Sequence, residues 1–458
     1  MYTSIEQLSP INKLFASYIK NNNLIAELNL DMSKNPYLEA MTLYPISSYP
    51  QFISQEVIDN LERCSEVMHK LIERLIRHYC NEHPLWLEQS MGIDVDLINR
   101  SFTKNCLEHF CSRFDLNQTS EGFKILEINS GACIGGWDIK FQEQAFKSID
   151  SLQSFFSHYN IKLVCRNPLI SLIASIYKGI KKLENFKDGE VAHAVFFVSD
   201  AHMKPQIKNF LTHLLANIAY ECNANMRFSF ALSKDELNPD KDEVYFRDKV
   251  VHALLFPNRI WDPSHYDLPD SILNAWFNNK LILPENPISN LIGDKRWLAL
   301  LWNARESPIF TTKEKDLINE FIIPAYTFSS PVGSSVSDQE NMTDELLQSK
   351  ENYVLKPGVG FQGDDVFVGK YTSQIQWQAA VEAAKSNDNM IAQKYAQPCT
   401  VLGKDNNEIG VFNAVWGMFV IGSSYSGLWA RVDRVNNEES KGVINCAKGA
   451  TEAIVFEV

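Results

Sequence analysis

The sequence lacks the features that mark membrane and secreted proteins. The longest apolar run near the C-terminal end, residues 415–421, is much shorter than the roughly 20 residues that a membrane-spanning helix needs. The nine cysteines are scattered without a CxxC pair, which indicates free thiols. The N-terminus, MYTSIEQLSPINKLF, has no basic segment followed by an apolar core, so we predict no signal peptide. These absences predict a cytoplasmic protein.

A long run of Lys or Arg is also missing. The chain carries 43 Lys and Arg against 56 Asp and Glu, and its net charge is −13. Nucleic acids and anionic membrane surfaces are therefore poor partners, because both attract basic patches. The same acidity favours cationic small molecules, such as polyamines, near a binding site.

The composition that is present is that of a globular protein with more than one domain. At 458 residues the chain is too long for one compact core, and two or three domains are expected. Hydrophobic residues make up 45% of the chain and charged residues 22%, which is typical of globular proteins. Residues 55–78 carry apolar side chains at spacings of three and four. This spacing predicts a helix, and the first hundred residues look mainly helical.

The middle of the chain alternates strand-like and helical patterns. A helical pattern at 206–222 lies among strand-like runs at 194–198, 226–232 and 250–256. This order is typical of βαβ units and predicts a small parallel sheet. A helical region at 294–321 and a Ser- and Gly-rich linker at 326–341 follow. The sequence therefore predicts a mixed α/β fold.

A glycine-rich loop stands between two short apolar runs in ENYVLKPGVGFQGDDVFVGK, residues 351–370. Glycines let backbone N–H groups approach an anion closely, which suggests phosphate. Asp364 and Asp365 stand where a P-loop needs Lys and Ser or Thr, so a P-loop is excluded. We expect the tip of a β-hairpin, with Lys356 at the end of its first strand and three glycines in the loop: Gly358, Gly360 and Gly363. An ordinary hairpin turn with a solvated lysine is the alternative.

Polar side chains with oxygen donors gather around a second predicted strand, residues 123–128. Glu127 and Asn129 are two residues apart, so they lie on one face of that strand, and Asp115 precedes Glu127 by twelve residues. Carboxylate and amide oxygens suit Mg²⁺, which keeps waters and substrate phosphates as further ligands. The alternative is a surface strand with ordinary polar residues. Arg113 fits either a phosphate clamp or a salt bridge.

Together the oxygen donors and the glycine hairpin are what a nucleoside triphosphate site requires. The metal bridges the phosphates, and backbone amides with a lysine bind them from the other side. The strand at 390–395 follows the hairpin and its helix, where an adenine-binding edge is expected, although a buried sheet strand is the alternative.

The order of these motifs resembles a known enzyme family. RxD, twelve residues, ExN, a lysine before an apolar helix, a KP-glycine hairpin and a QxY strand follow one another here. This order resembles glutathionylspermidine synthases and their relatives with circularly permuted ATP-grasp domains, which join a carboxylate to an amine. The likeness covers residues 105–140 and 285–458 with recognisable motifs.

The resemblance implies a circularly permuted ATP-grasp fold in four parts. These are an N-terminal helical region (1–105), the magnesium-binding strands of the core (106–150), a pre-ATP-grasp α/β domain (151–290), and the part with the lysine, glycine hairpin and hinge (291–458). Asp115, Glu127 and Asn129 match the magnesium ligands of the family, and Arg113 matches an arginine near the reacting phosphate.

Further matches place the nucleotide and the acyl group. Lys295 and Lys356 correspond to lysines that contact the nucleotide phosphates. Arg431 resembles a late arginine that steadies the acyl phosphate, and Asn445 is a weaker match. The hinge, whose backbone meets adenine in the family, corresponds to Gln393, Lys394 and Tyr395.

One departure from the family pattern concerns the hairpin. The family commonly carries an arginine among the glycines, whereas residues 361–364 are Phe-Gln-Gly-Asp here. The change implies another arginine in its place, slower chemistry, or a substrate other than glutathione. Cys133 follows the second strand motif, and we expect a small buried side chain rather than a nucleophile there, because no base lies nearby in sequence.

The function that the resemblance implies is an ATP- and Mg²⁺-dependent carboxylate–amine ligase. It joins a small-molecule or peptide carboxylate to an amine through an acyl phosphate. An ATP-binding regulatory or interaction protein without turnover is a second hypothesis. A kinase-like enzyme that stops at phosphorylation is a third.

Overall fold

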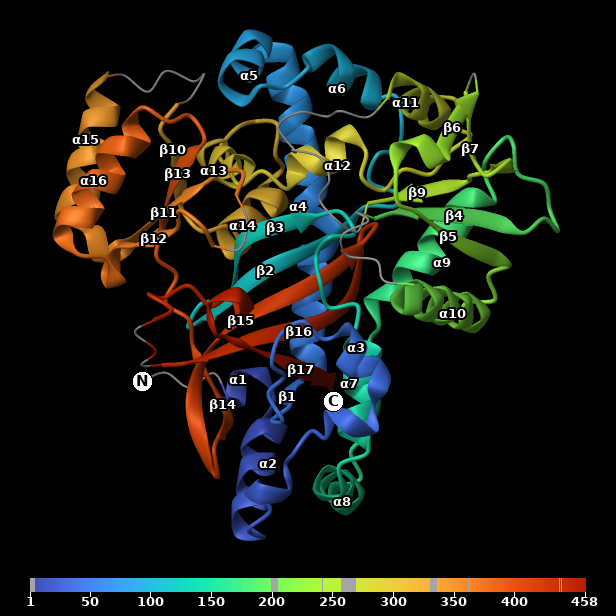
Figure 1. The fold of residues 1–458 in the computed structure, drawn as a ribbon. Helices are drawn as coiled ribbons and strands as arrows, with labels where there is room; N and C mark the ends of the chain where they lie inside the picture. Colours follow the sequence, from blue (N-terminus) through green and yellow to red (C-terminus); the bar gives the residue numbers. More distant parts are fainter. Residues whose placement is uncertain are drawn as a thin grey trace.

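A seven-stranded sheet forms the centre of the molecule (Figure 1). The computed structural model describes residues 5–198, 205–240, 242–256, 269–329, 336–360, 363–435, 437 and 439–458. The strand order is β1 (Gln51–Ile53), β17 (Thr451–Glu457), β16 (Ser424–Arg434), β15 (Glu408–Ile421), β2 (Cys111–Thr119) and β3 (Gly122–Ser130), and β14 (Thr400–Asp405) also pairs with β15. Only the β1–β17 pair in this sheet is parallel.

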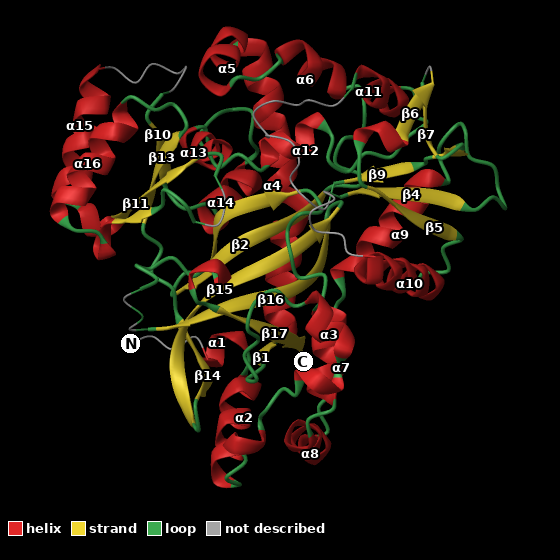
Figure 2. Cartoon of the chain, in the orientation of Figure 1, coloured by secondary structure: helices red, strands yellow, loops and turns green. Residues whose placement is uncertain are grey.

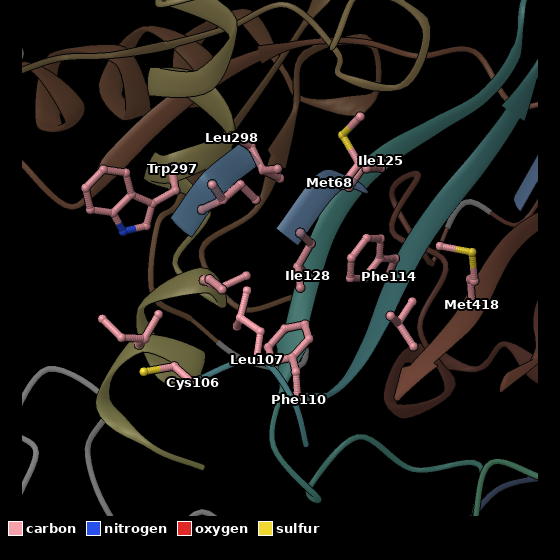
Figure 3. Close-up of a cluster of buried hydrophobic side chains, with 14 of the residues drawn as sticks. Met68, Cys106, Leu107, Phe110, Phe114, Ile125, Ile128, Trp297, Leu298 and Met418 are labelled. Carbon is pink, nitrogen blue, oxygen red and sulfur yellow. The ribbon is translucent and has the colours of Figure 1, made fainter. Parts of the chain in front are cut away.

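One face of the central sheet packs on the long helix α4 (Gln55–Glu82), which confirms the helix predicted from the apolar spacing at 55–78. Figure 3 shows part of this buried cluster, with Phe114, Ile128 and Met418 from the sheet and Met68 from the helix among its labelled residues. Side chains alternate along a strand, so these apolar residues on one face leave the residues between them on the other face. The polar residues predicted for the site lie on that second face.

A β-bulge interrupts the pairing of β2 with β3. Asp115 pairs with Glu127 and Leu116 with Ile125, so Leu126 has no opposite residue. A bulge of this kind releases a backbone group from the ladder and bends the strand. Here the carbonyl of Leu126 accepts a hydrogen bond from Lys356 Nζ at 2.8 Å, which ties the glycine hairpin to the central sheet.

A four-stranded sheet carries the glycine hairpin on one side of the central sheet (Figure 2). Trp377 and Leu346 of its two helices, α16 (Gln374–Lys385) and α15 (Val336–Gln348), pack with Tyr353 and Leu355. The order of strands is β10 (Ala325–Thr327), β13 (Met390–Lys394), β11 (Tyr353–Pro357) and β12 (Phe367–Val368). The antiparallel pairing of β11 with β12 confirms the predicted hairpin. Phe361 and Gln362, where the family arginine is missing, lie outside the described residues.

The predicted parallel sheet lies on the opposite side of the central sheet (Figure 2). It has the order β5 (Met226–Ala231), β4 (Ala192–Phe197), β9 (Ala253–Leu255), and both pairs are parallel. Helices α9 (Pro168–Ile180) and α10 (Pro205–Glu221) lie beside it (Figure 1). A further antiparallel sheet was not predicted because its strands are only two to four residues long: β6 (Leu237–Asp240), β7 (Glu243–Phe246) and β8 (Lys249–Val250).

The N-terminal region is mainly helical, as predicted, but it also completes the central sheet. β1 forms one edge of the sheet, and the segment before it makes a parallel bridge from Ile46 to Glu452. The remaining helices are α1 (Ile5–Leu8), α2 (Pro10–Asn21), α3 (Pro36–Met41), α5 (Pro84–Met91), α6 (Val95–Ser101), α7 (Ile139–Lys147), α8 (Asp150–Tyr159), α11 (Asp270–Phe277), α12 (Pro287–Ile292), α13 (Arg296–Asn303) and α14 (Thr312–Phe321). Within the described ranges, no helix has the length and apolar character needed to cross a membrane.

Candidate active site

A cavity of about 480 Å³ lies over the polar face of the central sheet. Strands β3, β2, β16 and β17 contribute to its walls, together with the glycine hairpin and residue 44 of the N-terminal segment. Eight residues singled out in the sequence line it: Arg113, Glu127, Asn129, Lys295, Gly360, Gly363, Arg431 and Asn445. The structure therefore brings together side chains from positions 113 to 445.

The central residue of this face is Gly417 on β15, which pairs with both Asp115 and Trp429. A Cβ atom at this position would lie 2.8 Å from Cδ of Arg113 and 3.0 Å from Cε3 of Trp429. Both distances are shorter than ordinary carbon contacts, so a side chain here forces its neighbours to move. Because Gly417 has no side chain, the side chain of Arg113 can lie over the sheet at this point.

Asp115 binds the two arginines of the site. Its Oδ1 accepts from Arg113 Nε at 2.7 Å, and its Oδ2 accepts from Arg431 Nη2 at 2.6 Å and Arg113 Nη2 at 3.1 Å. The carboxylate is only 1% exposed. Arg113 Nη1 also donates to the carbonyl of Ile134 in the loop after β3. Arg113 thus forms the expected salt bridge and also lines the cavity, and its role as a phosphate clamp stays a prediction.

These contacts differ from the magnesium role expected for Asp115, because guanidinium groups occupy both of its oxygens. Glu127 and Asn129 are placed differently, since both line the cavity and Asn129 Nδ2 lies 3.3 Å from Glu127 Oε1. Mg²⁺ is commonly held by one or two carboxylates together with substrate phosphates. Glu127 and Asn129 fit such a site, because both line the cavity. Asp115 does not, because it is buried, pairs with two guanidinium groups and is not among the residues that line the cavity. Among the described residues there is no group of three His, Cys, Asp or Glu side chains able to hold a metal.

Two lysines surround Glu127. Lys295 Nζ lies 3.3 Å from Glu127 Oε2 and 3.4 Å from the carbonyl of Gly360. Burial raises the pKa of the Glu127 carboxyl. The positive charges of Lys295, Lys356 and Arg431 have the opposite and larger combined effect, so the pKa lies well below its usual value. Burial lowers the pKa of Lys356 to about 8, against the opposing effect of Glu127. Four cationic side chains, Lys295, Lys356, Arg113 and Arg431, thus accompany the carboxylates of Glu127 and Asp115, and cations in this number suit phosphate.

The glycines of the hairpin have different environments. Gly360 and Gly363 line the cavity, and Lys448 Nζ donates to the carbonyl of Gly363 at 2.6 Å. Gly358 lies away from the cavity, where a Cβ atom would be 2.7 Å from Oδ1 of Asp294. Its carbonyl accepts from the backbone N–H of Lys295 at 3.0 Å. Gly358 thus holds Lys295 in place rather than facing a ligand.

The predicted hinge does not line the cavity. Gln393 is buried, and its Oε1 accepts from Lys356 Nζ at 2.8 Å. The backbone N–H of Lys394 donates to Pro324 and that of Tyr395 to Asn352, at 2.8 and 2.7 Å. Because protein carbonyls occupy these two N–H groups, neither is open to adenine in this arrangement. The assignment of this segment to adenine stays a prediction.

Several cavity residues were not predicted from the sequence. Trp429 and Glu452 both line the cavity, and no motif contained them. Glu452 is one of two glutamates in the otherwise mostly apolar stretch TEAIVFEV, and a charged residue in that setting was the one available signal. The prediction for Cys133 was wrong, because its side chain is exposed and lines the cavity. The loop after β3 turns it outward while Ala132 and Ile134 on either side are buried.

Two buried donor atoms at the cavity lack a hydrogen-bond partner among the described residues: Trp429 Nε1 and Arg431 Nε. As whole residues, Trp429 and Arg431 are 4% and 7% exposed. Buried donors are almost always hydrogen-bonded, so these two donors are available to an acceptor atom at the cavity. The fold and this site together define a mixed α/β protein with a polar cavity that carries three cationic side chains, Arg113, Lys295 and Arg431, with acidic side chains beside them.

Comparisons with known proteins agree with this fold. No family model and no curated protein matches the sequence. The solved structure of a glutathione synthetase-like effector from Globodera pallida in its apo form has a TM-score of 0.58 and 14% identity, and the match covers 98% of both chains. This similarity shows the fold of the chain and confirms the predicted mixed α/β class.

Two further solved structures are less similar. A putative γ-glutamylcysteine synthetase from Methylobacillus flagellatus has a TM-score of 0.38 and 10% identity over 87% of both chains. D-alanyl-alanine synthetase A from Vibrio cholerae has a TM-score of 0.31 and 10% identity over 57% of this chain and 74% of its own. These scores are too low to support a structural argument. The resemblance to glutathionylspermidine synthases and the circular permutation stay predictions.

Proposed function

We propose that the protein is an ATP-dependent carboxylate–amine ligase of the ATP-grasp type, with the glutathionylspermidine synthase resemblance as its nearest description. The observation that supports this function best is the arrangement within one cavity. Glu127, Asn129 and Lys295 lie beside the glycine hairpin, and Arg113 and Arg431 lie next to them on the sheet. The fold similarity to a glutathione synthetase-like effector agrees with this class.

In this proposal the residues act on two neighbouring groups. Glu127 and Asn129 would hold Mg²⁺, which supplies charge neutralisation of the phosphates when it is bound. Lys295, Gly360 and Gly363 line the same cavity and would face the γ-phosphate. A substrate carboxylate attacks that phosphorus to form an acyl phosphate and ADP. An amine then attacks the acyl carbon, an amide forms, and phosphate leaves.

The two arginines have a defined part in this sequence. Asp115 holds Arg113 and Arg431 in fixed orientations, so no reorganisation is needed as charge develops on the acyl group. Arg431 Nε and Trp429 Nε1 remain as donors for the substrate oxygens. Arg431 also supplies positive charge near the hairpin, which has no arginine of its own. Asp115 is thus a positioning residue in this mechanism.

A second candidate is an ATP-binding regulatory protein without turnover. The observation that favours it is the hairpin sequence, because residues 358–365 contain no Lys or Arg to face a γ-phosphate. Retention of Glu127, Asn129, Lys295 and Lys356 favours the ligase.

The test measures ADP and phosphate release from Mg-ATP with pooled acids, amino acids, peptides and polyamines, and identifies products by mass spectrometry. Glu127→Gln removes the carboxylate of the site. Glu121→Gln changes an exposed glutamate in the turn between β2 and β3 and serves as the matched control.

The expected product is an adduct one water lighter than its two substrates, absent with Glu127→Gln and present with Glu121→Gln. A phosphorylated acid without an amide identifies a kinase-like enzyme. ATP binding without turnover in every pool favours the regulatory protein. Failure to bind ATP refutes the assignment of the cavity.

A further inference from the structure

Glu452 is a buried carboxylate at the edge of the cavity, and the mechanism above does not use it. It lies on β17, directly across from Arg431 on β16, and is 8% exposed. The backbone of the N-terminal segment holds this strand, because Glu452 N donates to Pro45 and Ser47 N donates to Glu452, at 2.8 and 2.6 Å. The backbone of Glu452 is therefore held by β16 on one side and by the N-terminal segment on the other.

One oxygen of Glu452 is held and the other faces the cavity. Its Oε2 accepts from Gln142 Nε2 at 3.1 Å, and the same nitrogen donates to Asp138 Oδ2 at 3.0 Å. Within the part of the chain that the structure describes, Oε1 has no hydrogen-bond partner. The glutamine thus orients the carboxylate and leaves one oxygen for a ligand.

The groups around Glu452 favour its protonated form more than usual. Burial and the nearby Asp138 raise the pKa of Glu452 to about 8, against the opposing effects of Gln142, Arg113 and Arg431. The ionisable and charged groups that act on it from the neighbouring segments are Arg431 of β16, Arg113 of β2, Asp138 before α7 and Cys446 after β16, and Tyr44 of the N-terminal segment lines the same cavity. A general base works best when its pKa is close to the working pH.

The strand order places Glu452 at the end of the cavity opposite Glu127. Strands β3, β2, β15, β16 and β17 follow one another, and neighbouring strands are about 4.8 Å apart. Glu452 therefore lies about one strand spacing from Arg431 and about four from Glu127. Along the cavity the order is phosphate and metal residues, then the arginines, then Glu452. An acyl-phosphate ligase needs its phosphate, acyl carbon and amine in this same order.

We propose that Glu452 is the general base that deprotonates the amine substrate, which makes β17 the amine side of the cavity. This inference rests on the proposed ligase function. Oε1 takes one proton from the ammonium group, and the freed lone pair attacks the acyl carbon. A C–N bond forms, the bond from that carbon to the phosphate oxygen breaks, and phosphate leaves with the bonding electrons. The second proton of the nitrogen passes to the leaving phosphate.

The experiment compares two nucleophiles with Glu452→Gln, a variant that keeps the size of the side chain. Hydroxylamine is neutral at pH 7 and needs no base, whereas a cationic amine from the pools must first lose a proton. With the acid pool and Mg-ATP, we expect hydroxamate formation within about twofold of the wild type. Amide formation should fall by about 10²- to 10⁴-fold, the usual contribution of a general base.

A second variant tests the acid–base role by a shift in pH. Asp138→Asn removes the neighbouring negative charge, so the rise of the amide-forming rate with pH should move to lower pH. A purely structural role does not move this profile. Glu457→Gln is a matched control, because Glu457 is also a buried glutamate of β17 but binds Arg166 and Tyr425 away from the cavity.

The outcomes separate the inference from the function on which it rests. Wild-type amide formation by Glu452→Gln, or equal loss of amide and hydroxamate, overturns the general-base assignment while the ligase function stands. A wild-type protein that makes no hydroxamate from any acid overturns the ligase function itself. Loss of amide formation with retained hydroxamate supports the inference.

Discussion

Replacing Asp115 by Asn tests whether this residue holds the arginines or binds the metal. The substitution keeps the shape of the side chain but removes the charge that pairs with Arg113 and Arg431. The side chains of these arginines are 11% and 9% exposed, so water replaces the lost partner poorly. Breaking a buried ion pair in this way reduces the free energy of unfolding by about 3–5 kcal/mol.

The assay is urea denaturation followed by tryptophan fluorescence, in EDTA and again with Mg-ATP. We expect the loss of stability in both conditions, because the arginine contacts need no metal. Asp405→Asn is the matched control, since Asp405 pairs with Arg434 at the surface and such pairs contribute about 0–1 kcal/mol. A loss that appears only with Mg-ATP would show that Asp115 is a metal ligand and refute the reasoning.

Three further predictions concern other parts of the molecule. Gly417→Val should lower the free energy of unfolding by about 1–3 kcal/mol and reduce ATP turnover, because its Cβ atom meets Arg113; urea titration and ADP release measure both. Glu452 has a folded-state pKa raised to about 8, so its protonated form is favoured by folding. The contribution of the protonated Glu452 to the free energy of unfolding is complete below pH 4.5 and is lost as the pH rises to about 8. Glu452→Gln does not titrate, so it should flatten the pH dependence of the urea midpoint in this window. Trp377→Ala, in the hairpin domain, should remove about 3–5 kcal/mol, since the ring is fully buried and its Nε1 donates to Leu346; an unchanged urea midpoint contradicts this.

Local patterns were sufficient for the elements that carry most of the proposed site. The glycine run between two short apolar segments predicted the β11–β12 hairpin, and the two-residue spacing placed Glu127 and Asn129 on one face. The apolar spacing at 55–78 predicted α4. Each of these depends on backbone geometry within a few residues, which sequence periodicity reports directly.

Contacts between distant strands were not accessible in the same way. Arg431 and Asp115 are 316 positions apart, and their ion pair depends on β16, β15 and β2 lying side by side. The bulge at Leu126 and the free space at Gly417 also depend on cross-strand partners. The exposure of Cys133 was predicted wrongly for the same reason, because the elements packed around the loop after β3 decide which of its side chains point outward.

The sequence by itself determined the helix α4, the small parallel sheet and the glycine hairpin, and it placed Glu127, Asn129 and Lys295 with that hairpin. The tertiary structure alone decided that Asp115 holds two arginines, that the hinge amides are occupied, and that Glu452 completes the cavity. The physical reason is that local periodicity depends on neighbours in sequence, whereas ion pairing, burial and pKa depend on strands that meet only after the whole sheet has assembled.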